Sequence, residues 1–347
     1  MFSTCPSSQG HLTKQPSTIR KLAMSLLRIG VASAVVFALL LLALALAVRQ
    51  PTFGRYPFPA GPRADPALLR KHVAFLTTEA SGRNTKHPER LNRAADYIAE
   101  AFREAGAQVS EQPYQAGRTT CRNIIARFGP SSGPILVVGA HYDVFADLPG
   151  ADDNASGVAG LLELARLLGA RPVSSPVELV AFSTEEPPFF DSPQMGSAVH
   201  ARSLRDSGAS VKAMICLEMI GYYSARQPNR NFLTHVIYPR AGDFICAAGR
   251  WSDRRLAREI KKAFSGATTV PGCSYSGPAV FIGADLSDHR NYWAEGWPAV
   301  MLTDTSYLRN PNYHSSRDTA ETLDYDRMAG VVDGLLSAAV HLSASPN

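Results

Sequence analysis

Several histidines and carboxylates of this sequence come directly after apolar segments that are typical of buried strands, or open the helix or loop that follows. The carboxyl ends of parallel strands meet at one edge of a sheet, so side chains that follow those strands lie close together. The residues concerned are His141, Asp153, Glu185, Glu186, Glu218 and His314. Imidazole and carboxylate are the usual zinc ligands where thiolates are lacking. Five ligands of these two kinds, one of them a carboxylate shared between the ions, are expected to hold two metal ions roughly 3.5–4 Å apart.

Each of these residues, taken alone, has a simpler explanation. A single histidine is more often packed or surface-exposed than metal-bound, and an aspartate before a helix often caps it. The Glu-Glu pair could equally lie in a solvated loop. Composition alone leaves Asp152 beside Asp153, and His289 beside His314, as competing ligands. The convergence of all these side chains on one predicted sheet edge is what favours a metal site.

Short motifs in this sequence resemble those of the co-catalytic zinc aminopeptidases (metallopeptidase family 28), whose relatives include glutamate carboxypeptidases and glutaminyl cyclases. In chain order they are H-x-D, G-A-D-D-N-A-S-G, E-E, L-E-M-I-G-Y, S-D-H and Y-H-x-x-x-D-T. The resemblance spans roughly residues 66–345. It implies the fold of that family, a single three-layer α/β domain whose mixed, mostly parallel central sheet is flanked by helices.

The resemblance also implies a ligand for each of two zinc ions. His141 and Glu218 match the residues that hold one ion, and Glu186 and His314 match those that hold the other. Asp153 matches the bridging carboxylate, which directly precedes N-A-S-G in the family. Glu218 departs from the family pattern, in which aspartate is usual at this position. Because glutamate has the same donor atoms on a side chain one methylene longer, we expect it to bind as well.

Four further residues acquire roles from the same resemblance. Glu185 matches the general base, and Asp143 matches the carboxylate that orients the first zinc histidine through its other ring nitrogen. Asp288 is expected to lie beside the ligands and to support them without binding metal itself. Tyr313 is expected to help stabilise the oxyanion formed in the reaction. His289, in the S-D-H motif, is expected to lie near the site without being a ligand.

Alternating apolar strands and amphipathic helices must position these residues. Predicted helices cover 65–79, 88–105, 154–168, 196–207, 252–264 and 324–342, and predicted strands cover 123–128, 134–138, 177–182, 212–219 and 299–303. The helix over 252–264 is amphipathic and basic. Alternation of this kind predicts an α/β sheet covered on both faces. We find no internal repeat, and we predict one catalytic domain over residues 65–347.

The first 64 residues differ in composition from the rest of the chain. Residues 29–48 are twenty uncharged, mostly aliphatic residues, which is enough for one helical membrane span. The basic segment 1–28 before it is expected to stay in the cytoplasm, which places the catalytic domain on the periplasmic or extracellular face. The alternative is a cleaved signal peptide, for which alanines at 43, 45 and 47 offer small-residue cleavage contexts. Residues 49–64, rich in Pro and Gly, are predicted to form a short stiff linker.

The charge balance and the cysteine spacing argue against some classes of function and of metal site. Seven of the 35 basic residues precede Asp65, which leaves 28 basic residues against 30 acidic ones, so a nucleic-acid-binding surface is not expected. The five cysteines contain no C-x-x-C pair, which argues against a thiolate zinc site. The leading interpretation is an aminopeptidase acting on peptides or small amides. A glutaminyl cyclase-like acyltransferase and a non-catalytic peptidase-like domain are the alternatives.

Overall fold

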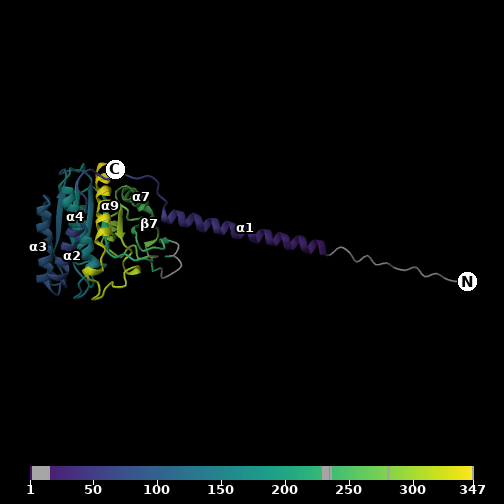
Figure 1. The fold of residues 1–347 in the computed structure, drawn as a ribbon, viewed down its shortest axis with the longest axis horizontal. Coiled ribbons are helices and arrows are strands. Elements are labelled where there is room, and N and C mark those ends of the chain that lie inside the picture. Colours follow the sequence, from purple (N-terminus) through teal and green to yellow (C-terminus); the bar gives the residue numbers. More distant parts are fainter. Residues whose placement is uncertain (2–15, 229–233, 235–236, 280–281, 346–347) are drawn as a thin grey trace. The chain divides into compact units, whose positions relative to one another are not determined.

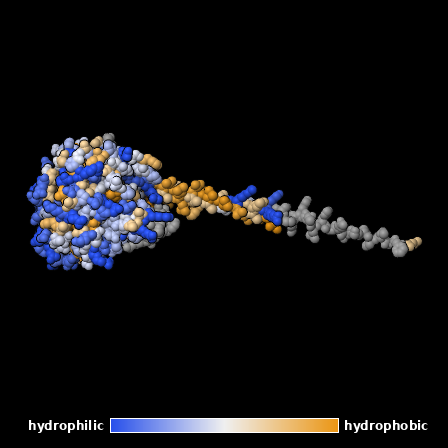
Figure 2. All heavy atoms as spheres, in the orientation of Figure 1, coloured by the Kyte–Doolittle hydropathy of each residue, from blue (hydrophilic) through white to orange (hydrophobic). Residues whose placement is uncertain are grey.

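The computed structural model describes residues 1, 16–228, 234, 237–279 and 282–345. The chain divides into two compact units, Met1–Ala47 and Val48–Asn347. Helix α1 (Pro16–Arg49) is the one helix in the described residues that is long and apolar enough to cross a membrane. Figure 2 shows apolar side chains along most of its length. A signal sequence near an N-terminus has the same length and composition, so this finding fits both an anchor and a leader.

The second unit, drawn as strands flanked by helices in Figure 1, is built on an eight-stranded sheet with the order β1-β2-β4-β3-β5-β8-β6-β7. Its four central strands, β4, β3, β5 and β8, run parallel, whereas β1, β2 and β6 each pair antiparallel with a neighbour. The strands are β1 (Gln108–Ala116), β2 (Thr119–Phe128), β3 (Ile135–His141), β4 (Val177–Phe182), β5 (Val211–Leu217), β6 (Ile245–Gly249), β7 (Gly272–Ser276) and β8 (Ala299–Thr303). Every residue of β3, β4 and β8 is buried, as their continuous apolar sequences predict.

Helices cover both faces of this sheet. The α-helices in the described residues of the second unit are α2 (Pro66–Thr78), α3 (Pro88–Glu104), α4 (Gly157–Gly169), α5 (Gly196–Asp206), α7 (Arg254–Ala267), α8 (His289–Ala294) and α9 (Tyr325–Ala344). Leu136 and Val138 of β3 pack in the core that includes α2, α3, α4, α7 and α9. Ile135 and Val137, which alternate with them, pack in a second core with α5 and α8. The predicted three-layer α/β fold is therefore confirmed.

The sequence pattern does not predict some of the observed elements. Strand β1 carries a proline and many polar residues because it is an edge strand whose side chains are mostly exposed or half-buried. Strands β6 and β7 have only five residues each, too few to show a period. Helix α8, with six residues, is equally short. By contrast, helices with a clear cap were predicted well, since Asp65 accepts a hydrogen bond from the Ala67 amide at 2.8 Å and caps α2.

The predicted linker packs along the catalytic unit. We call residues 50–64 the strap. The Tyr56 ring stacks on the His341 ring of α9 at 3.6 Å, and the Tyr56 amide donates to the Lys262 carbonyl of α7 at 3.1 Å. Near the end of the strap, Arg63 forms an ion pair with Asp333 of α9 at 2.7 Å. The strap is therefore attached to α7 and α9 and does not behave as a free spacer.

Candidate metal centre

The predicted ligands lie where the parallel strands end. His141 is the last residue of β3, and Glu218 directly follows the last residue of β5. Glu186 follows β4 after three intervening residues, and His314 lies in the loop after β8. Asp153 comes from the short π-helical turn η1 (Ala151–Ser156) that leads into α4. All five residues therefore lie at or near the edge of the sheet where the parallel strands end, as the sequence predicts.

Two residues shape the turn that carries Asp153. Gly150 has φ 58°, and a Cβ atom built on it would lie 2.4 Å from the Asp153 carbonyl oxygen, so only glycine fits there. The Asn154 side chain donates to the Leu217 carbonyl at 2.8 Å and accepts from the Met219 amide at 3.2 Å. These bonds join the Asp153 turn to the two residues that flank Glu218. The glycine and asparagine of the G-A-D-D-N motif thus have structural roles.

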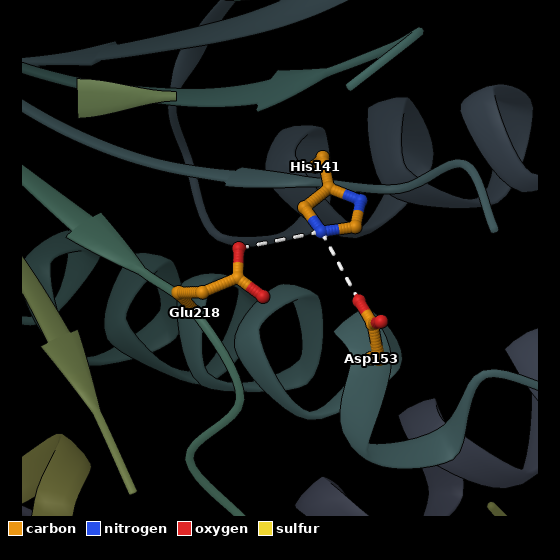
Figure 3. A group of neighbouring side chains, drawn as sticks. All are labelled: His141, Asp153 and Glu218. Atoms are coloured by element: carbon orange, nitrogen blue, oxygen red, sulfur yellow. Dashed lines mark ion pairs between the residues drawn. The ribbon is translucent and has the colours of Figure 1, made fainter. Parts of the chain in front are cut away.

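The first group of candidate ligands consists of His141, Asp153 and Glu218 (Figure 3). The Nε2 atom of His141 lies 3.4 Å from Oδ1 of Asp153 and 3.4 Å from Oε2 of Glu218. All three residues are buried, and Figure 3 shows both carboxylates directed toward the same ring nitrogen. One nitrogen and two oxygens that converge in this way would fill three of the four positions of a tetrahedral zinc site.

The second group consists of Asp153, Glu186 and His314. The Nε2 atom of His314 lies 3.1 Å from Oδ2 of Asp153 and 3.3 Å from Oε1 of Glu186. The His314 ring is stacked between the rings of Phe145, at 4.1 Å, and Tyr313, at 3.8 Å, which fixes its orientation. Asp153 therefore presents one carboxylate oxygen to each group, as a bridging ligand would.

The electrostatics of the cluster fit a bound cation. Burial and the nearby Asp153 carboxylate raise the pKa of Glu186 to about 7. Burial also raises the pKa of Glu185 well above its usual value, and Glu186 and Glu218 add to this effect. Among the described residues, Oε1 of Glu186 and Nε2 of His314 are buried without a hydrogen-bond partner. Buried, mutually repelling carboxylates with unused donor atoms are what a divalent cation stabilises.

Two other carboxylates hold the backbone of the ligands. The carboxylate of Asp143 accepts from the amides of Glu185 and Glu186 at 3.0 and 3.1 Å. The carboxylate of Asp318 accepts in the same way from the amides of Asp152 and Asp153 at 2.9 and 3.1 Å. Each carboxylate thus fixes two consecutive peptide groups next to the metal groups. Asp318 was not singled out from the sequence, although it is the aspartate of Y-H-x-x-x-D-T.

The expected contact between Asp143 and His141 is looser than the resemblance implied. The Nδ1 atom of His141 donates to the Asp143 main-chain carbonyl at 3.2 Å, while the Asp143 carboxylate lies 3.6 Å away. Burial alone would lower the pKa of His141, but Glu218, Asp143 and Asp153 outweigh it and raise that pKa well above the usual value. The carbonyl bond fixes the tautomer that leaves Nε2 free to bind metal.

Asp152 and His289, the competing candidates, point elsewhere. The carboxylate of Asp152 accepts from the Gly221 amide at 2.9 Å and from the Asn310 side chain at 2.7 Å. His289 is fully buried, and its Nε2 atom donates to the Ala284 carbonyl at 2.7 Å. Neither residue belongs to a metal-ligating group within the described part of the chain.

Asp288 and Tyr313 lie close to the groups. Asp288 is fully buried, and burial raises its pKa to about 7 although the charge of His141 lowers it. Both oxygens of its carboxylate are without a hydrogen-bond partner in the described residues. Tyr313 stacks on His314 and lines the pocket at the metal groups. Both positions are compatible with the supporting roles expected from the sequence.

Ser287 supports Glu218, the candidate ligand that departs from the family pattern. Its hydroxyl donates to Oε2 of Glu218 at 2.6 Å, so it holds the longer glutamate side chain in place. We expect Ser287→Ala to weaken zinc binding about 10- to 100-fold, because loss of a ligand's hydrogen-bond partner has effects of this size. Competition with a fluorescent chelator measures the affinity. Ser276→Ala is the control, since Ser276 is equally buried but its hydroxyl lacks a partner in the described residues. Equal affinities in the two variants would contradict this role.

Arg83, which the sequence did not indicate, fixes the loop between His141 and Asp153. It is fully buried, and its guanidinium donates to the carbonyls of Tyr142, Leu76, Pro149 and Gly150 at 2.6–3.0 Å. Burial lowers its pKa to about 10, so it keeps its charge at neutral pH.

We expect Arg83→Met to lower the free energy of unfolding by about 3 kcal/mol, because several buried carbonyls lose their donor at once. Thermal and urea unfolding measure this loss. Arg93→Met is the control, since Arg93 is exposed and donates to one carbonyl, that of Glu79. A loss for Arg83→Met no larger than that of the control would show that the guanidinium does not hold the loop.

A pocket opens at the two groups of candidate ligands. Asp153, Glu185, Glu186 and Glu218 contribute to its polar side. Its apolar side is formed by Tyr238, Ile282, Leu286, Met301 and Leu308. A ligand in this pocket would thus meet buried carboxylates and a largely apolar wall at the same time.

The family model described as Peptidase family M28 matches residues 123–339 of this chain. An uncharacterized protein of Escherichia coli, YfbL, is 45% identical over 80% of the chain and 89% of its own length. A probable zinc metalloprotease of Pyricularia oryzae is 26% identical over 81% of the chain and 65% of its own length. A probable leucine aminopeptidase of Trichophyton verrucosum is 26% identical over 69% of the chain and 62% of its own length. The chain thus spans slightly less than two thirds of these two fungal relatives.

Solved structures share the fold. LapB from Legionella pneumophila superposes with a TM-score of 0.66 and 21% identity, over 86% of this chain and 79% of its own. A glutaminyl cyclase from Bacteroides thetaiotaomicron superposes with a TM-score of 0.63 and 18% identity, over 81% of this chain and 99% of its own. The family match, the relatives and the fold agree with the family inferred from the motifs. The chain is therefore a metallopeptidase and belongs to peptidase family M28.

Proposed function

We propose that this protein is an aminopeptidase that hydrolyses the N-terminal bond of peptides with the help of two zinc ions. The proposed ligands are His141, Asp153, Glu186, Glu218 and His314. The observation that carries the proposal is the sharing of Asp153, whose two oxygens lie 3.4 and 3.1 Å from the ring nitrogens of two different histidines. A mononuclear site would need only one of these groups.

Glu185 is the proposed general base. Zinc ions, when bound, would supply a water of lowered pKa and polarise the scissile carbonyl. Glu185 is buried next to Glu186 and lines the same pocket, so it can accept a proton from the attacking water. It then passes this proton to the leaving amine as the carbon–nitrogen bond breaks. Tyr313, at the wall of the pocket, is placed to donate to the developing oxyanion.

The pocket supports an exopeptidase that prefers apolar N-terminal residues. Its apolar wall suits a side chain such as that of leucine, and Glu185, the one pocket carboxylate that is not a proposed ligand, can accept a hydrogen bond from a free α-amino group. A charged side chain on the N-terminal residue, or an acetylated amino group, would lose one of these two contacts. The name of the Trichophyton verrucosum relative agrees with this preference.

An assay with aminoacyl-coumarins tests the proposed function. Full-length protein in detergent should hydrolyse leucyl-coumarin faster than aspartyl-coumarin and leave N-acetyl-leucyl-coumarin intact. A chelator should abolish the activity, and added zinc should restore it. Hydrolysis that persists after complete removal of metal, or that prefers the acetylated substrate, would refute a zinc aminopeptidase.

A glutaminyl cyclase is the second candidate, because a cyclase structure covers almost the same part of the chain with a similar TM-score. The shared fold does not separate the two reactions. A peptide with an N-terminal glutamine distinguishes them, since cyclisation releases ammonia and keeps the peptide bond, whereas hydrolysis releases free glutamine. The complete set of candidate ligands and the base argue against a non-catalytic domain, and any turnover would exclude it.

We also propose that α1 anchors the enzyme in a membrane, with the catalytic unit on the periplasmic or extracellular face. The apolar segment 29–48 and the positive charges before it support this orientation. An intact N-terminus on the mature protein, together with protease access to the catalytic unit from outside, would support the anchor. A mature N-terminus near residue 48 would show that α1 is a cleaved leader.

A further inference from the structure

Helix α7 carries a cationic face that the catalytic site does not use. At 3.6 residues per turn, its basic residues fall within about a third of the helix circumference. They are Arg254, Arg255, Arg258, Lys261 and Lys262. The opposite face, with Leu256, Ile260 and Phe264, is buried in the core. The only acidic residue within α7, Glu259, pairs with Lys262 at 3.0 Å.

This charge stands out because the rest of residues 65–347 is acidic, with 29 acidic residues against 23 basic ones outside α7. The three arginines Arg254, Arg255 and Arg258 are exposed, and none of them forms an ion pair with a described residue. The strap and α1 contribute no acidic residue, because the sequence has none before Asp65. Nearby, Asp253 is buried and pairs with Arg250 at 3.2 Å. The exposed positive charge of α7 is therefore not neutralised within the described part of the protein.

Contacts with the start of the strap hold the cationic face of α7 close to the C-terminal end of the apolar segment 29–48. The Lys261 ammonium donates to the carbonyls of Arg49 and Gln50 at 3.1 and 2.7 Å. The Ser274 hydroxyl of β7 also donates to the Arg49 carbonyl, at 3.0 Å. The candidate membrane span ends at Val48, next to the residues that Lys261 contacts. The edge of a bilayer that holds this span would therefore lie near α7.

Two exposed aromatic side chains accompany the cationic face. Trp251 lies three residues before the start of α7 and is 47% exposed, and Phe53 of the strap is 87% exposed. Among described residues from Val48 onward, Leu286 is the only other large hydrophobic side chain in this exposed class, and it lines the catalytic pocket. Aromatic residues beside basic ones are typical of segments that sit in the headgroup region of a membrane.

We propose that the cationic face of α7, together with Trp251 and Phe53, binds the anionic headgroups of the bilayer that holds α1. This proposal rests on the membrane anchor proposed above, and it is independent of the catalytic mechanism. It adds a second, electrostatic contact to the apolar one, and so fixes which side of the catalytic unit faces the lipid. Phosphate groups suit the arginines because each guanidinium can donate two hydrogen bonds to them.

Quenching of Trp251 fluorescence by brominated lipids tests this contact. Full-length protein is placed in nanodiscs of neutral phosphatidylcholine, or of the same lipid with about 30% phosphatidylglycerol, a typical anionic surface. Trp251→Phe supplies the signal of Trp293 and Trp297, which is subtracted. We expect quenching of Trp251 to be about twofold or more stronger in anionic discs. Molar salt, which shortens the screening length to about 3 Å, should abolish the difference.

Matched variants identify the residues responsible. Arg254→Gln, Arg255→Gln and Arg258→Gln combined should remove the extra quenching, and the three Arg→Lys changes should retain most of it. Arg93→Gln, Arg103→Gln and Arg118→Gln combined, which remove the same charge at the other end of the sheet, should have no effect. All variants should keep wild-type leucyl-coumarin hydrolysis and unfolding temperature, so a failure of the proposed catalytic function would be seen separately.

Three results would overturn the proposal. The first is equal Trp251 quenching in neutral and anionic discs. The second is full quenching in the α7 glutamine variant. The third is a wild-type protein that forms dimers on the disc which the glutamine variant loses, with no change in quenching, since the face would then bind a second copy of the chain instead of lipid.

Discussion

Replacing Glu185 by glutamine is expected to lower kcat by about 10²- to 10⁴-fold, the usual contribution of a general base. Glutamine has nearly the same size, but its amide cannot accept a proton from the attacking water. Since Glu185 is not among the proposed ligands, zinc content and unfolding temperature should stay close to wild type. Leucyl-coumarin hydrolysis under saturating substrate measures kcat, and elemental analysis measures the metal.

The control for this variant is Glu104→Gln, an exposed glutamate at the end of α3. It should hydrolyse the substrate at the wild-type rate. Turnover of Glu185→Gln within a few-fold of wild type would rule out Glu185 as the base. Loss of metal in the same variant would instead show that Glu185 is a ligand, because only a ligand change removes the ion directly.

Replacing Asp153 by asparagine should remove both metal ions, because one side chain serves both groups. Wild-type protein should bind roughly two zinc ions per chain, and Asp153→Asn should bind fewer than one. Glu186→Gln, which alters only the second group, should keep about one ion, held by His141, Asp153 and Glu218. Titration followed by elemental analysis distinguishes these three stoichiometries.

Asp147→Asn controls for the loss of a carboxylate in the same loop, since Asp147 is exposed and belongs to neither group. Circular dichroism should show native secondary structure in all the variants. If Asp153→Asn still bound two ions, the bridging role would be wrong. If Asp153→Asn and Glu186→Gln each lost a single ion, the two groups would bind independently and Asp153 would belong to only one of them.

The candidate ligands could be found from the sequence because each follows a recognisable element. Buried parallel strands read as continuous apolar runs, so the polar residue that ends each run is conspicuous, as with His141 after β3 and Glu218 after β5. The same runs led to the three-layer fold. The choice of Asp153 over Asp152 came from the motif alone, because both precede the same helix.

The supporting residues could not be found in this way, because their partners are distant in the sequence. Arg83 acts on carbonyls 59 to 67 residues further along, as well as on that of Leu76. Ser287 lies 69 residues after the glutamate to which it donates. The strap shows a related difficulty. Its Pro and Gly content indicates a linker, but Tyr56 and Arg63 attach it to helices more than two hundred residues away.

The paired bonds of Asp143 and Asp318 have a consequence for metal exchange. Asp143 accepts a hydrogen bond from the Glu186 amide, and Asp318 accepts one from the Asp153 amide. The backbone of these candidate ligands is therefore held by other protein side chains and not by metal. Stripping the ions should therefore leave a folded apoenzyme with its ligands still in place. Zinc should then return in one fast binding step, at a rate set by ion capture and not by refolding, and we expect hydrolysis to stop and resume as the available zinc changes.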